Sequence, residues 1–571
     1  MSPASVDLLR EAQASAESLV EVLLRRATFE PETEMLFYSA EGDPIEDRLS
    51  VARLDRRARA LAHVLAGQAE RGARAMLFFK PGLEFVEALF GCLYAGLIAV
   101  PTYPPRMVRG ELEKKSVRAR LLAEDATPTV LLADRTSEEA VRRAFPGPTP
   151  IIVPSAVPDA PFEPTIPGRD EVAVIQYTSG STSAPKGVML THGQLLANSR
   201  TIHAAFQHSP AARGVLWLPH EHDMGLVGSI LQSIFGAGPA LLMSPMAFLQ
   251  DPMSWLRAIS RFGATTAGGP NFAYQLLADR AEPEDLVGLD LSRWEVAFVG
   301  AEPVRAQTLE AFQRKFEPVG FRATSFVPCY GLAESTLMVT SCQKGRGPRV
   351  LTVSAQALER GAIEPSAEGR RLVSSGTPVD SRVSIRPIGD SALLPDGRIG
   401  EVCVEGPSIA QGYLGRPTDP AFEGRLLRTG DLGFLYEGEL YVTGRHKDVV
   451  IVDGANHYAE DLEATIDACH EELRRSSGAV FGVETRETEG VVVVWETRRP
   501  RTKAAPAEIQ RAIRAAVAEW HGLSLVDVVL TAPGGVARTE SGKIRRQECR
   551  RAYLAGELPG GLQNARKPKD S

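Results

Sequence analysis

Short apolar runs alternate with longer amphipathic segments up to about residue 340. The runs at 75–79, 129–133, 172–176 and 296–299 have the length and composition of buried β-strands. Strands that alternate with helical patterns are typical of βαβ units, in which helices join parallel strands. The pattern therefore predicts an α/β fold with stacked, largely parallel sheets in this part of the chain.

The pattern changes after this region. Residues 343–372 are rich in Gly, Pro and charged side chains, which indicates a loop or an insertion. From 382 to 441 the apolar runs become short, with turn signals at 395–397 and 437–438. These features predict a small antiparallel β-barrel or subdomain.

The residues beyond 445 predict a compact tail domain. Apolar residues recur there at helical spacing in two sets: Leu462, Ile466, Cys469 and Leu473, then Ile509, Ile513, Val517 and Trp520. Pro506 and Gly522 are typical boundary residues for the second helix, and a strand is expected at 491–495. From about 555 the chain is rich in Gly, Pro and Lys, and we expect it to be disordered.

Composition excludes several classes of protein. With 44% hydrophobic and 24% charged residues, the chain is typical of a globular protein. Its net charge of −7 gives no general attraction to nucleic acid or to anionic membranes. Six scattered cysteines lack metal-binding spacing and indicate reduced thiols in a cytoplasmic protein. The most apolar segment, 88–100, is too short to span a membrane and predicts a buried helix.

A loop rich in Gly, Ser and Thr at 177–187 is the strongest chemical signal in the chain. It follows the expected strand at 172–176 and precedes a helix start, and it ends in Pro-Lys-Gly. Small residues let the backbone approach a ligand, and hydroxyls, amide groups and a lysine then suit a polyphosphate. A flexible linker is the alternative for such a stretch alone. The spacing of a Walker loop is absent.

Three further clusters suit other parts of a nucleotide. An Asp on the Thr-Gly-Asp turn at 429–431 can accept hydrogen bonds from both ribose hydroxyls. In 330–336, Tyr330 offers a stacking face for adenine and Glu334 a ligand for Mg²⁺. In 538–546 a lysine after glycine can reach an anionic centre. Taken alone, each cluster is better explained by structure only: a turn at 429–431, a helix N-terminus at 330–336 and a solvated basic surface at 538–546.

Together and in this order, these motifs resemble the adenylate-forming superfamily of acyl and aryl ligases, luciferases and nonribosomal peptide adenylation domains. The segments 444–448 and 454–458 are similar to the family's hinge and the first strands of its C-terminal domain, and 300–302 to its adenine-contacting turn. Two further segments, 218–228 and 268–274, resemble signatures of the fatty acyl-AMP ligases within this superfamily. The resemblance extends from about residue 35 to 550.

The resemblance implies a domain organisation. The large N-terminal domain, 1–446, would hold two stacked, mostly parallel α/β sheets and a small β-barrel subdomain at about 373–446. The small, mobile α+β C-terminal domain would span 447–571. The segment 343–372 would be the insertion that hinders the use of CoA in the relatives.

The resemblance also implies ATP-dependent activation of a fatty acid to acyl-AMP, with ATP and Mg²⁺ as cofactors. Lys543 would bridge the carboxylate and the α-phosphate, and Glu334 would bind Mg²⁺. ATP and AMP would be held by Thr178, Ser179, Gly180, Ser181, Thr182, Lys186, Gly300, Ala301, Glu302, Tyr330, Gly331, Asp431 and Arg445.

The acyl site implied by the resemblance would contain His222, Asp223, Met224, Gly225, Phe272 and Tyr274, with His222 near the carboxylate. The apolar stretch 226–235 could wall an acyl tunnel or belong to the core. The acyl group would then pass to the phosphopantetheine thiol of an acyl carrier protein acting in trans, after rotation at the hinge residue Lys447. Basic residues around 538–551 could attract an acidic carrier or form a solvated face.

Four functions are considered at this point. A fatty acyl-AMP ligase is favoured, with a fatty acyl-CoA ligase as the alternative. An amino-acid adenylating domain is disfavoured, because the segment after Trp217 lacks the usual pattern with an aspartate for the substrate ammonium. A non-catalytic binding module is disfavoured because Lys543, Glu334 and Asp431 are all present.

Overall fold

The structure is a computed structural model. It describes residues 15–105, 107–108, 111–112, 116–178, 185–209, 211–236, 238–452, 455–484, 489–498, 504–539 and 542–559. The tail expected to be disordered falls largely at 560–571, outside these ranges.

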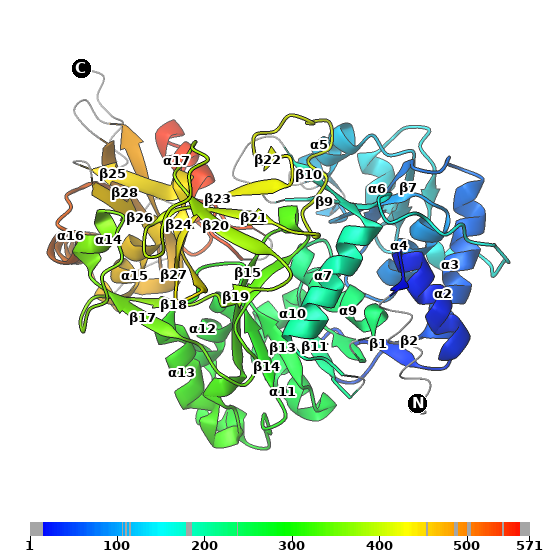
Figure 1. Ribbon diagram of the computed structural model, residues 1–571, viewed down its shortest axis with the longest axis horizontal. Coiled ribbons are helices and arrows are strands. Elements are labelled where there is room, and N and C mark those ends of the chain that lie inside the picture. The colour runs from blue at the N-terminus through cyan, green and yellow to red at the C-terminus, as the bar shows by residue number, and fades with distance from the viewer. Residues whose placement is uncertain are drawn as a thin grey trace.

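The larger N-terminal sheet has nine strands in the order β19-β16-β15-β14-β13-β11-β12-β1-β2 (Figure 1). Its strands are β1 (Glu34–Tyr38), β2 (Asp47–Ser50), β11 (Gly214–Leu216), β12 (Ala240–Leu242), β13 (Thr266–Gly269), β14 (Val296–Val299), β15 (Phe326–Gly331), β16 (Met338–Ser341) and β19 (Thr377–Pro378). Neighbours from β15 to β1 are parallel, whereas β2, β16 and β19 pair antiparallel at the ends. The carboxyl ends of the parallel strands therefore lie along one edge of the sheet. Residues that follow β13, β14 and β15 line a cavity at this edge.

A second sheet has six strands in the order β10-β9-β4-β3-β7-β8. Its strands are β3 (Arg74–Phe78), β4 (Ile98–Thr102), β7 (Val130–Ala133), β8 (Ile151–Ile152), β9 (Val172–Tyr177) and β10 (Gly187–Thr191). All pairs are parallel except β9 with the edge strand β10. The strands predicted at 75–79, 129–133, 172–176 and 296–299 are thus confirmed, as is the α/β class.

Helices cover both sheets, and they alternate with the strands along the chain (Figure 1). They are α2 (Leu19–Phe29), α3 (Val51–Ala66), α4 (Glu84–Tyr94), α5 (Ser116–Ala126), α6 (Glu138–Ala144), α7 (His192–Ala205), α8 (Asp223–Gly225), the π-helix η2 (Leu226–Ile230), α9 (Leu231–Phe235), α10 (Pro245–Gln250), α11 (Met253–Phe262), α12 (Asn271–Arg280) and α13 (Ala306–Phe316). A two-stranded hairpin, β5 (Met107–Val108) and β6 (Glu111–Leu112), precedes α5. The first turn of α7 has a capping box between Thr191 and Gln194, which fixes where this helix starts after β10.

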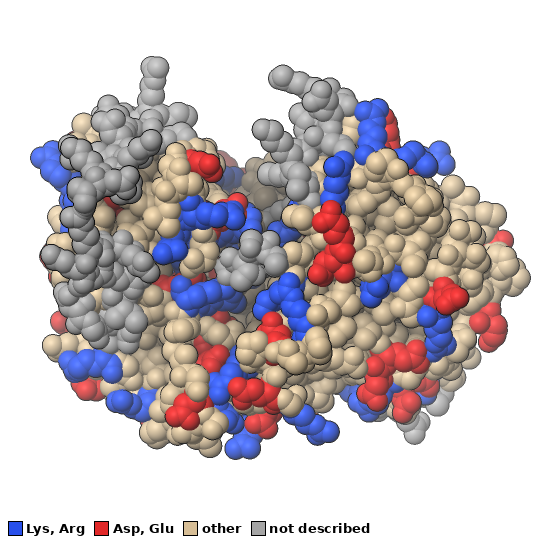
Figure 2. All heavy atoms as spheres, turned by 90° about the horizontal axis from the view of Figure 1, so that it is seen from above, with Lys and Arg blue, Asp and Glu red and all other residues tan. Residues whose placement is uncertain are grey.

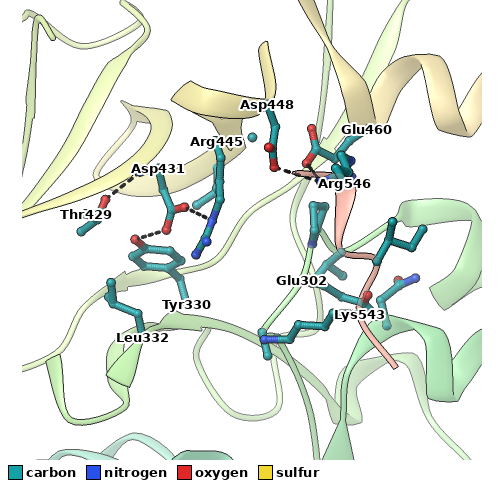
Figure 3. Close-up of a pocket in the computed structure, with 18 of the residues that line it drawn as sticks. Glu302, Tyr330, Leu332, Thr429, Asp431, Arg445, Asp448, Glu460, Lys543 and Arg546 are labelled. Atoms are coloured by element: carbon teal, nitrogen blue, oxygen red, sulfur yellow. Dashed lines mark hydrogen bonds and ion pairs between the residues drawn. The ribbon is translucent and has the colours of Figure 1, made fainter. Parts of the chain in front are cut away.

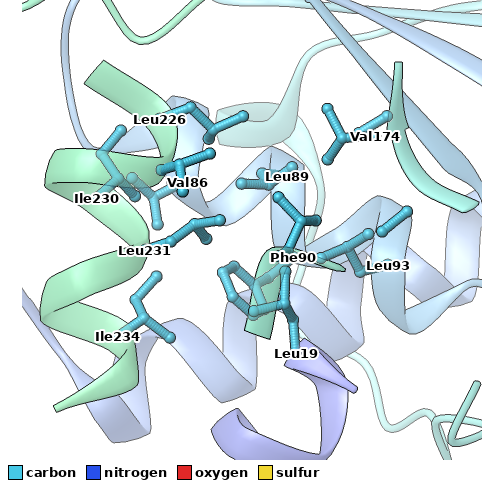
Figure 4. Close-up of a cluster of buried hydrophobic side chains, with 14 of the residues drawn as sticks. Leu19, Val86, Leu89, Phe90, Leu93, Val174, Leu226, Ile230, Leu231 and Ile234 are labelled. Carbon is cyan, nitrogen blue, oxygen red and sulfur yellow. The ribbon is translucent and has the colours of Figure 1, made fainter. Parts of the chain in front are cut away.

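Helix α4 lies in the centre of the largest core, and every residue from 85 to 94 is buried. Its apolar side chains pack against one face of η2 and α9, as Figure 4 shows for Leu89, Phe90, Leu226 and Ile230. The stretch 226–235 is therefore mostly core rather than tunnel wall. The predicted helix at 88–100 is wrong at its end, because Gly96 turns the chain at φ +72° and residues 98–102 form β4.

A five-stranded antiparallel sheet follows, as the short apolar runs predict. Its strands are β20 (Arg382–Arg386), β21 (Gly400–Glu405), β22 (Phe422–Glu423), β23 (Leu426–Tyr436) and β24 (Glu439–Arg445). The segment predicted to be a loop or insertion contains regular structure: β17 (Val350–Val353), α14 (Ala355–Glu359) and β18 (Arg370–Val373), with β17 and β18 paired as a hairpin.

The C-terminal part has its own apolar core and stands at one end of the molecule (Figure 1). It contains β25 (Val449–Val452), β26 (Ala455–Tyr458), α15 (Ala459–Cys469), β27 (Leu473–Glu484), β28 (Glu489–Thr497), α16 (Pro506–His521), β29 (Leu525–Thr531) and α17 (Arg546–Ala555). Leu473 starts a strand instead of extending the helix, and Trp520 is 72% exposed instead of facing the core. We refer to residues 447–559 as the C-terminal lobe.

Candidate active site

A cavity of about 1570 Å³ lies between the N-terminal sheets, the antiparallel sheet and the C-terminal lobe. The candidate residues that line it are Thr178, Lys186, His222, Asp223, Met224, Phe272, Gly300, Ala301, Glu302, Tyr330, Gly331, Glu334, Asp431, Arg445, Lys447 and Lys543. Ser179, Gly180, Ser181 and Thr182 lie outside the described residues. Residues from all the motifs singled out in the sequence thus meet around one space.

Two candidate acyl-site residues do not line this cavity. Tyr274 is fully buried in an aromatic cluster with Trp294 and Phe312, and its hydroxyl donates to the backbone oxygen of Phe298 at 2.9 Å. The expected contact of Tyr274 with an acyl chain is therefore wrong. Gly225 is buried because its Cα packs against the backbone, where an added Cβ would lie 1.9 Å from the Pro219 oxygen. Its φ of −75° is ordinary for a helix, so the absent side chain serves to let the backbone of Pro219 approach closely.

One cluster joins the two predicted nucleotide motifs on β15 and β23. The hydroxyl of Tyr330 donates to Oδ2 of Asp431 at 2.8 Å, and Nε of Arg445 lies 2.8 Å from Oδ1 (Figure 3). Asp431 is 5% exposed, and β23 and β24 place it directly opposite Arg445. The carboxylate is thus held in one orientation by two donors.

The turn after β14 is bound to the start of α12. Ala301 has φ +65°, and an added Cβ on Gly300 would lie 2.6 Å from the Cys329 oxygen, so the turn packs tightly on β15. The side chain of Glu302 accepts a 2.6 Å hydrogen bond from the backbone N–H of Phe272. Burial raises the pKa of this carboxyl. The turn therefore forms a rigid wall of the cavity.

Lys543 enters the cavity from a tight turn of the C-terminal lobe. The backbone N–H of Thr539 donates to the oxygen of Lys543 at 2.7 Å, and the Lys543 N–H donates to the Thr539 hydroxyl at 3.0 Å. Gly542 has φ +85° and lies against the ring of Phe272, so the turn docks on the N-terminal domain. Figure 3 shows Lys543 beside Glu302.

The charges around Lys543 favour a cation in this cavity. Burial lowers the pKa of the Lys543 ammonium, and the carboxylate of Asp223 acts in the opposite direction. Burial lowers the pKa of His222 to about 3, with Lys543 adding to the effect, so the imidazole is neutral. Nε2 of His222 is buried without a hydrogen-bond partner in the described structure. The arrangement provides one cation and one uncommitted polar group at the same end of the cavity.

An apolar recess extends the cavity away from these charges. Its lining includes Ile202 and Phe206 of the α7 region, Gly228 of η2, and Phe298 and Leu337 from the large sheet. The rings of Phe206 and Phe298 stack at 5.8 Å between centroids. The apolar face of η2 and α9 packs on α4, so the side of η2 that faces the recess contributes Gly228 to its lining.

The candidate metal ligand Glu334 is held by a residue that the sequence analysis missed. The hydroxyl of Tyr413 donates to Oε1 of Glu334 at 2.6 Å, and Nζ of Lys186 lies 4.4 Å from the Tyr413 ring centroid. Lys186 also pairs with Asp419 at 3.0 Å. Tyr413 lies between Gly412 and Gly415, far in the sequence from the motifs that contain Lys186 and Glu334. Sequence patterns alone therefore give little indication that it belongs to the site.

The C-terminal lobe is tied both to the hinge and to the insertion. Within the lobe, Arg546 pairs with Asp448, beside the expected hinge residue Lys447, and with Glu460 and Glu463 of α15. Across the lobes, Arg370 of β18 pairs with Asp461 of α15, and its guanidinium lies over the Tyr458 ring at 5.6 Å. Leu358, Leu372, Phe434 and Tyr458 share one apolar cluster. The insertion thus restrains this orientation of the lobe.

The basic segment 538–551 is not a free cationic face. Arg538 donates to the backbone oxygens of Ser476 and Gly542, Arg546 is surrounded by carboxylates, and Arg545 pairs with Glu548. Across the visible part of the face in Figure 2, Lys and Arg are interspersed with Asp and Glu. Among the helices of the described ranges, none is long and apolar enough to cross a membrane.

Comparison with known proteins gives consistent matches over nearly the whole chain. Residues 24–414 match the family model described as AMP-binding enzyme, and 447–561 match the Disco-interacting protein 2-like AMP domain. The chain is 40% identical over 570 residues to the medium-chain-fatty-acid–[acyl-carrier-protein] ligase JamA of Moorena producens, covering 95% of this chain and 96% of that one.

Solved structures agree with this similarity. A chain from studies of fatty acyl-adenylate ligases of E. coli and L. pneumophila aligns with a TM-score of 0.88 and 32% identity, covering 95% of this chain and 99% of that one. A fatty acyl-adenylate ligase from L. pneumophila in complex with acyl adenylate and pyrophosphate aligns with a TM-score of 0.74 and 35% identity, covering 96% and 98%.

Proposed function

The chain belongs to the AMP-binding enzyme family, as one of its fatty acyl-AMP ligases, and from this premise we propose how its residues divide the reaction. It activates a fatty acid with ATP to acyl-AMP, releasing pyrophosphate, and transfers the acyl group to the phosphopantetheine thiol of an acyl carrier protein. One observation carries the residue assignment: Lys543 and the Tyr330–Asp431–Arg445 cluster line the same cavity.

In the first step, a carboxylate oxygen attacks the α-phosphorus of ATP, and the bond to pyrophosphate breaks. Both reactants are anions, so catalysis rests on positioning and on charge neutralisation. Lys543 supplies the positive charge between carboxylate and α-phosphate, and His222 orients the carboxylate with its uncommitted Nε2. Asp431 and Arg445 hold the ribose, while Tyr330 and the turn at 300–302 enclose adenine.

Lys186 and Thr178, with residues 179–182, bind the β- and γ-phosphates in this proposal. Glu334 provides one carboxylate beside them, which fits Mg²⁺ because this ion is commonly held by one or two carboxylates plus phosphate oxygens. The bound ion would neutralise the phosphate charge. The contribution of the chain is to hold Glu334 and Lys186 in place.

The apolar recess binds the alkyl chain, since each buried CH₂ contributes about 0.8 kcal/mol without polar contacts. We expect Gly228→Leu to shift the substrate preference toward shorter acids. An added Cβ at Gly228 would lie 3.0 Å from Cδ2 of Leu337, so a larger side chain narrows the recess. Pyrophosphate release with a series of saturated fatty acids measures this shift, and we expect about a fourfold loss for each methylene excluded.

The matched control is Gly147→Leu, at an exposed glycine that has no positive φ, has open space around it and lies outside the cavity lining. Equal losses of Gly228→Leu with short and long acids would contradict an acyl chain beside Gly228, because a general folding defect does not depend on substrate length.

For the second step, the C-terminal lobe rotates about Lys447 and withdraws Lys543, which opens a path for the thiol. The contacts of Arg370, in the segment 343–372, with Asp461 and Tyr458 limit the orientations that the C-terminal lobe can adopt. This restriction favours a carrier protein over free CoA as the acceptor. We expect the carrier to be a separate protein. A fatty acyl-CoA ligase is the alternative function.

The deciding experiment supplies labelled fatty acid and ATP with CoA, with a phosphopantetheine-bearing carrier protein, or with neither. We expect acyl-AMP in all three reactions and acyl transfer to the carrier. Acyl-CoA formed at a rate comparable to carrier acylation would favour the alternative instead. Absence of pyrophosphate release with every acid would contradict the function itself.

A further inference from the structure

Tyr413 contacts both of the side chains assigned above to the phosphate and metal end of the nucleotide. It is 4% exposed and lies between β21 and β22, far in sequence from Lys186 and Glu334. Its hydroxyl donates to Oε1 of Glu334 at 2.6 Å. The Lys186 ammonium lies over the Tyr413 ring, 4.4 Å from the ring centroid. One side chain therefore links two groups that otherwise belong to separate motifs.

The backbone fixes where Tyr413 stands. Residues 411–414 run along the free edge of β10, with the N–H of Gln411 donating to the oxygen of Met189 at 3.2 Å and the N–H of Leu414 to Gly187 at 2.8 Å. Strand β10 begins directly after Lys186. The N–H of Ala410 donates to the backbone oxygen of Glu334 at 2.9 Å. Backbone hydrogen bonds therefore fix the segment 410–414 beside both Glu334 and the strand that follows Lys186.

The Lys186 ammonium has a second fixed contact. It pairs with Asp419 at 3.0 Å, and Arg416 donates to the oxygen of Pro185 at 2.9 Å. The other flank of the Tyr413 ring meets Phe422 edge-on at 5.2 Å between centroids. The ring therefore has no room to swing away, and it supports the ammonium by a cation–π contact.

We propose that Tyr413 is a positioning residue that orients Glu334 as the metal ligand and supports Lys186 as the phosphate ligand of the nucleotide site. Because Oε1 accepts from the phenol, the carboxylate of Glu334 is fixed in the orientation from which it would hold the metal ion. The inference rests on the proposed function for the identity of the nucleotide, ATP.

Two variants separate the two contacts of Tyr413. Tyr413→Phe keeps the ring under Lys186 and removes the donor to Glu334, whereas Tyr413→Leu removes both. Tyr436→Phe, which removes a phenol outside the cavity lining, is the matched control. The measurements are the Kd of ATP by calorimetry in EDTA and in Mg²⁺, the Mg²⁺ concentration for half-maximal pyrophosphate release, and the melting temperature.

We expect Tyr413→Phe to bind ATP in EDTA like the wild type. Its gain in ATP affinity from Mg²⁺ should fall about tenfold, as when an outer partner of a metal ligand is removed. The KM for the fatty acid should not change. Tyr413→Leu should in addition weaken ATP binding in EDTA, by about two- to fivefold, because the cation–π support is lost.

A wild-type response of Tyr413→Phe to Mg²⁺ would overturn the role toward Glu334. Equal ATP affinities of the Phe and Leu variants in EDTA would overturn the role toward Lys186. Equal losses of ATP affinity with and without Mg²⁺ in Tyr413→Phe, together with a lower melting temperature, would indicate a purely structural tyrosine. Failure of the wild type to release pyrophosphate would contradict the proposed function and leave the calorimetric comparison of Tyr413 intact.

Discussion

Lys543→Ala is expected to slow acyl-AMP formation by about 10²–10³, the typical cost of removing one preorganised charge donor from a site. The loss should fall on the chemical step. In the proposed assignment, ATP binds through Asp431, Arg445 and Lys186 of the N-terminal domain, and the substitution leaves these residues in place. Pyrophosphate release with a saturating fatty acid measures the rate, and calorimetry measures the Kd of ATP.

The matched control for this prediction is Arg511→Ala. Arg511 is an exposed cation on α16 of the same lobe, outside the cavity lining, and its Nε donates within its own helix. A general effect of lost positive charge on the lobe would appear in both variants. Pyrophosphate release by Lys543→Ala at the wild-type rate would remove Lys543 from the reaction, whatever its position in the cavity.

The arrangement of the sheets follows from local patterns, because buried parallel strands are continuous apolar runs. The strand at 172–177 is one example, and its burial on both faces makes the run easy to identify. The segment 88–100 shows the limit of this reasoning. Both α4 and β4 are buried there, so hydrophobicity does not separate them, and a single glycine at 96 divides the run.

Helical spacing also predicts burial less well than it predicts the helix itself. Trp520 continues the apolar series Ile509, Ile513 and Val517, and these three are fully buried, yet Trp520 near the end of α16 projects beyond the core. Helical spacing gives the face of α16 on which Trp520 lies, but not how far the core extends along that face.

The candidate site depends on contacts between residues that are far apart in the sequence, and sequence patterns predict such contacts least well. Asp431 and Tyr330 were each predicted to bind nucleotide, but their hydrogen bond depends on how β15 meets β23. Tyr274 was assigned to the acyl site because it follows Phe272 in a motif. On α12 these two residues point in different directions, Phe272 to the cavity and Tyr274 to the aromatic core.

Asp431→Asn is expected to weaken ATP binding by about 100-fold. Two charge-assisted hydrogen bonds to the ribose hydroxyls contribute at least about 1.5 kcal/mol each, which together corresponds to this factor. Both carboxylate oxygens already accept from Tyr330 and Arg445, and each has a second lone pair for a ribose hydroxyl. The amide of Asn loses the charge and replaces one acceptor with a donor. The Kd of ATP by calorimetry measures the effect.

A nucleotide lacking both hydroxyls separates ribose recognition from damage to the Tyr330–Arg445 contacts. Wild type should bind 2′,3′-dideoxy-ATP much more weakly than ATP, whereas this difference should be much smaller for Asp431→Asn, whose amide keeps one neutral acceptor. Asp396→Asn, on an exposed turn of the same antiparallel sheet, should keep the wild-type preference for ATP. If Asp431→Asn still preferred ATP over the dideoxy analogue as strongly as the wild type, the ribose would lie elsewhere. The loss of affinity would then come from Arg445, left without its partner at 2.8 Å.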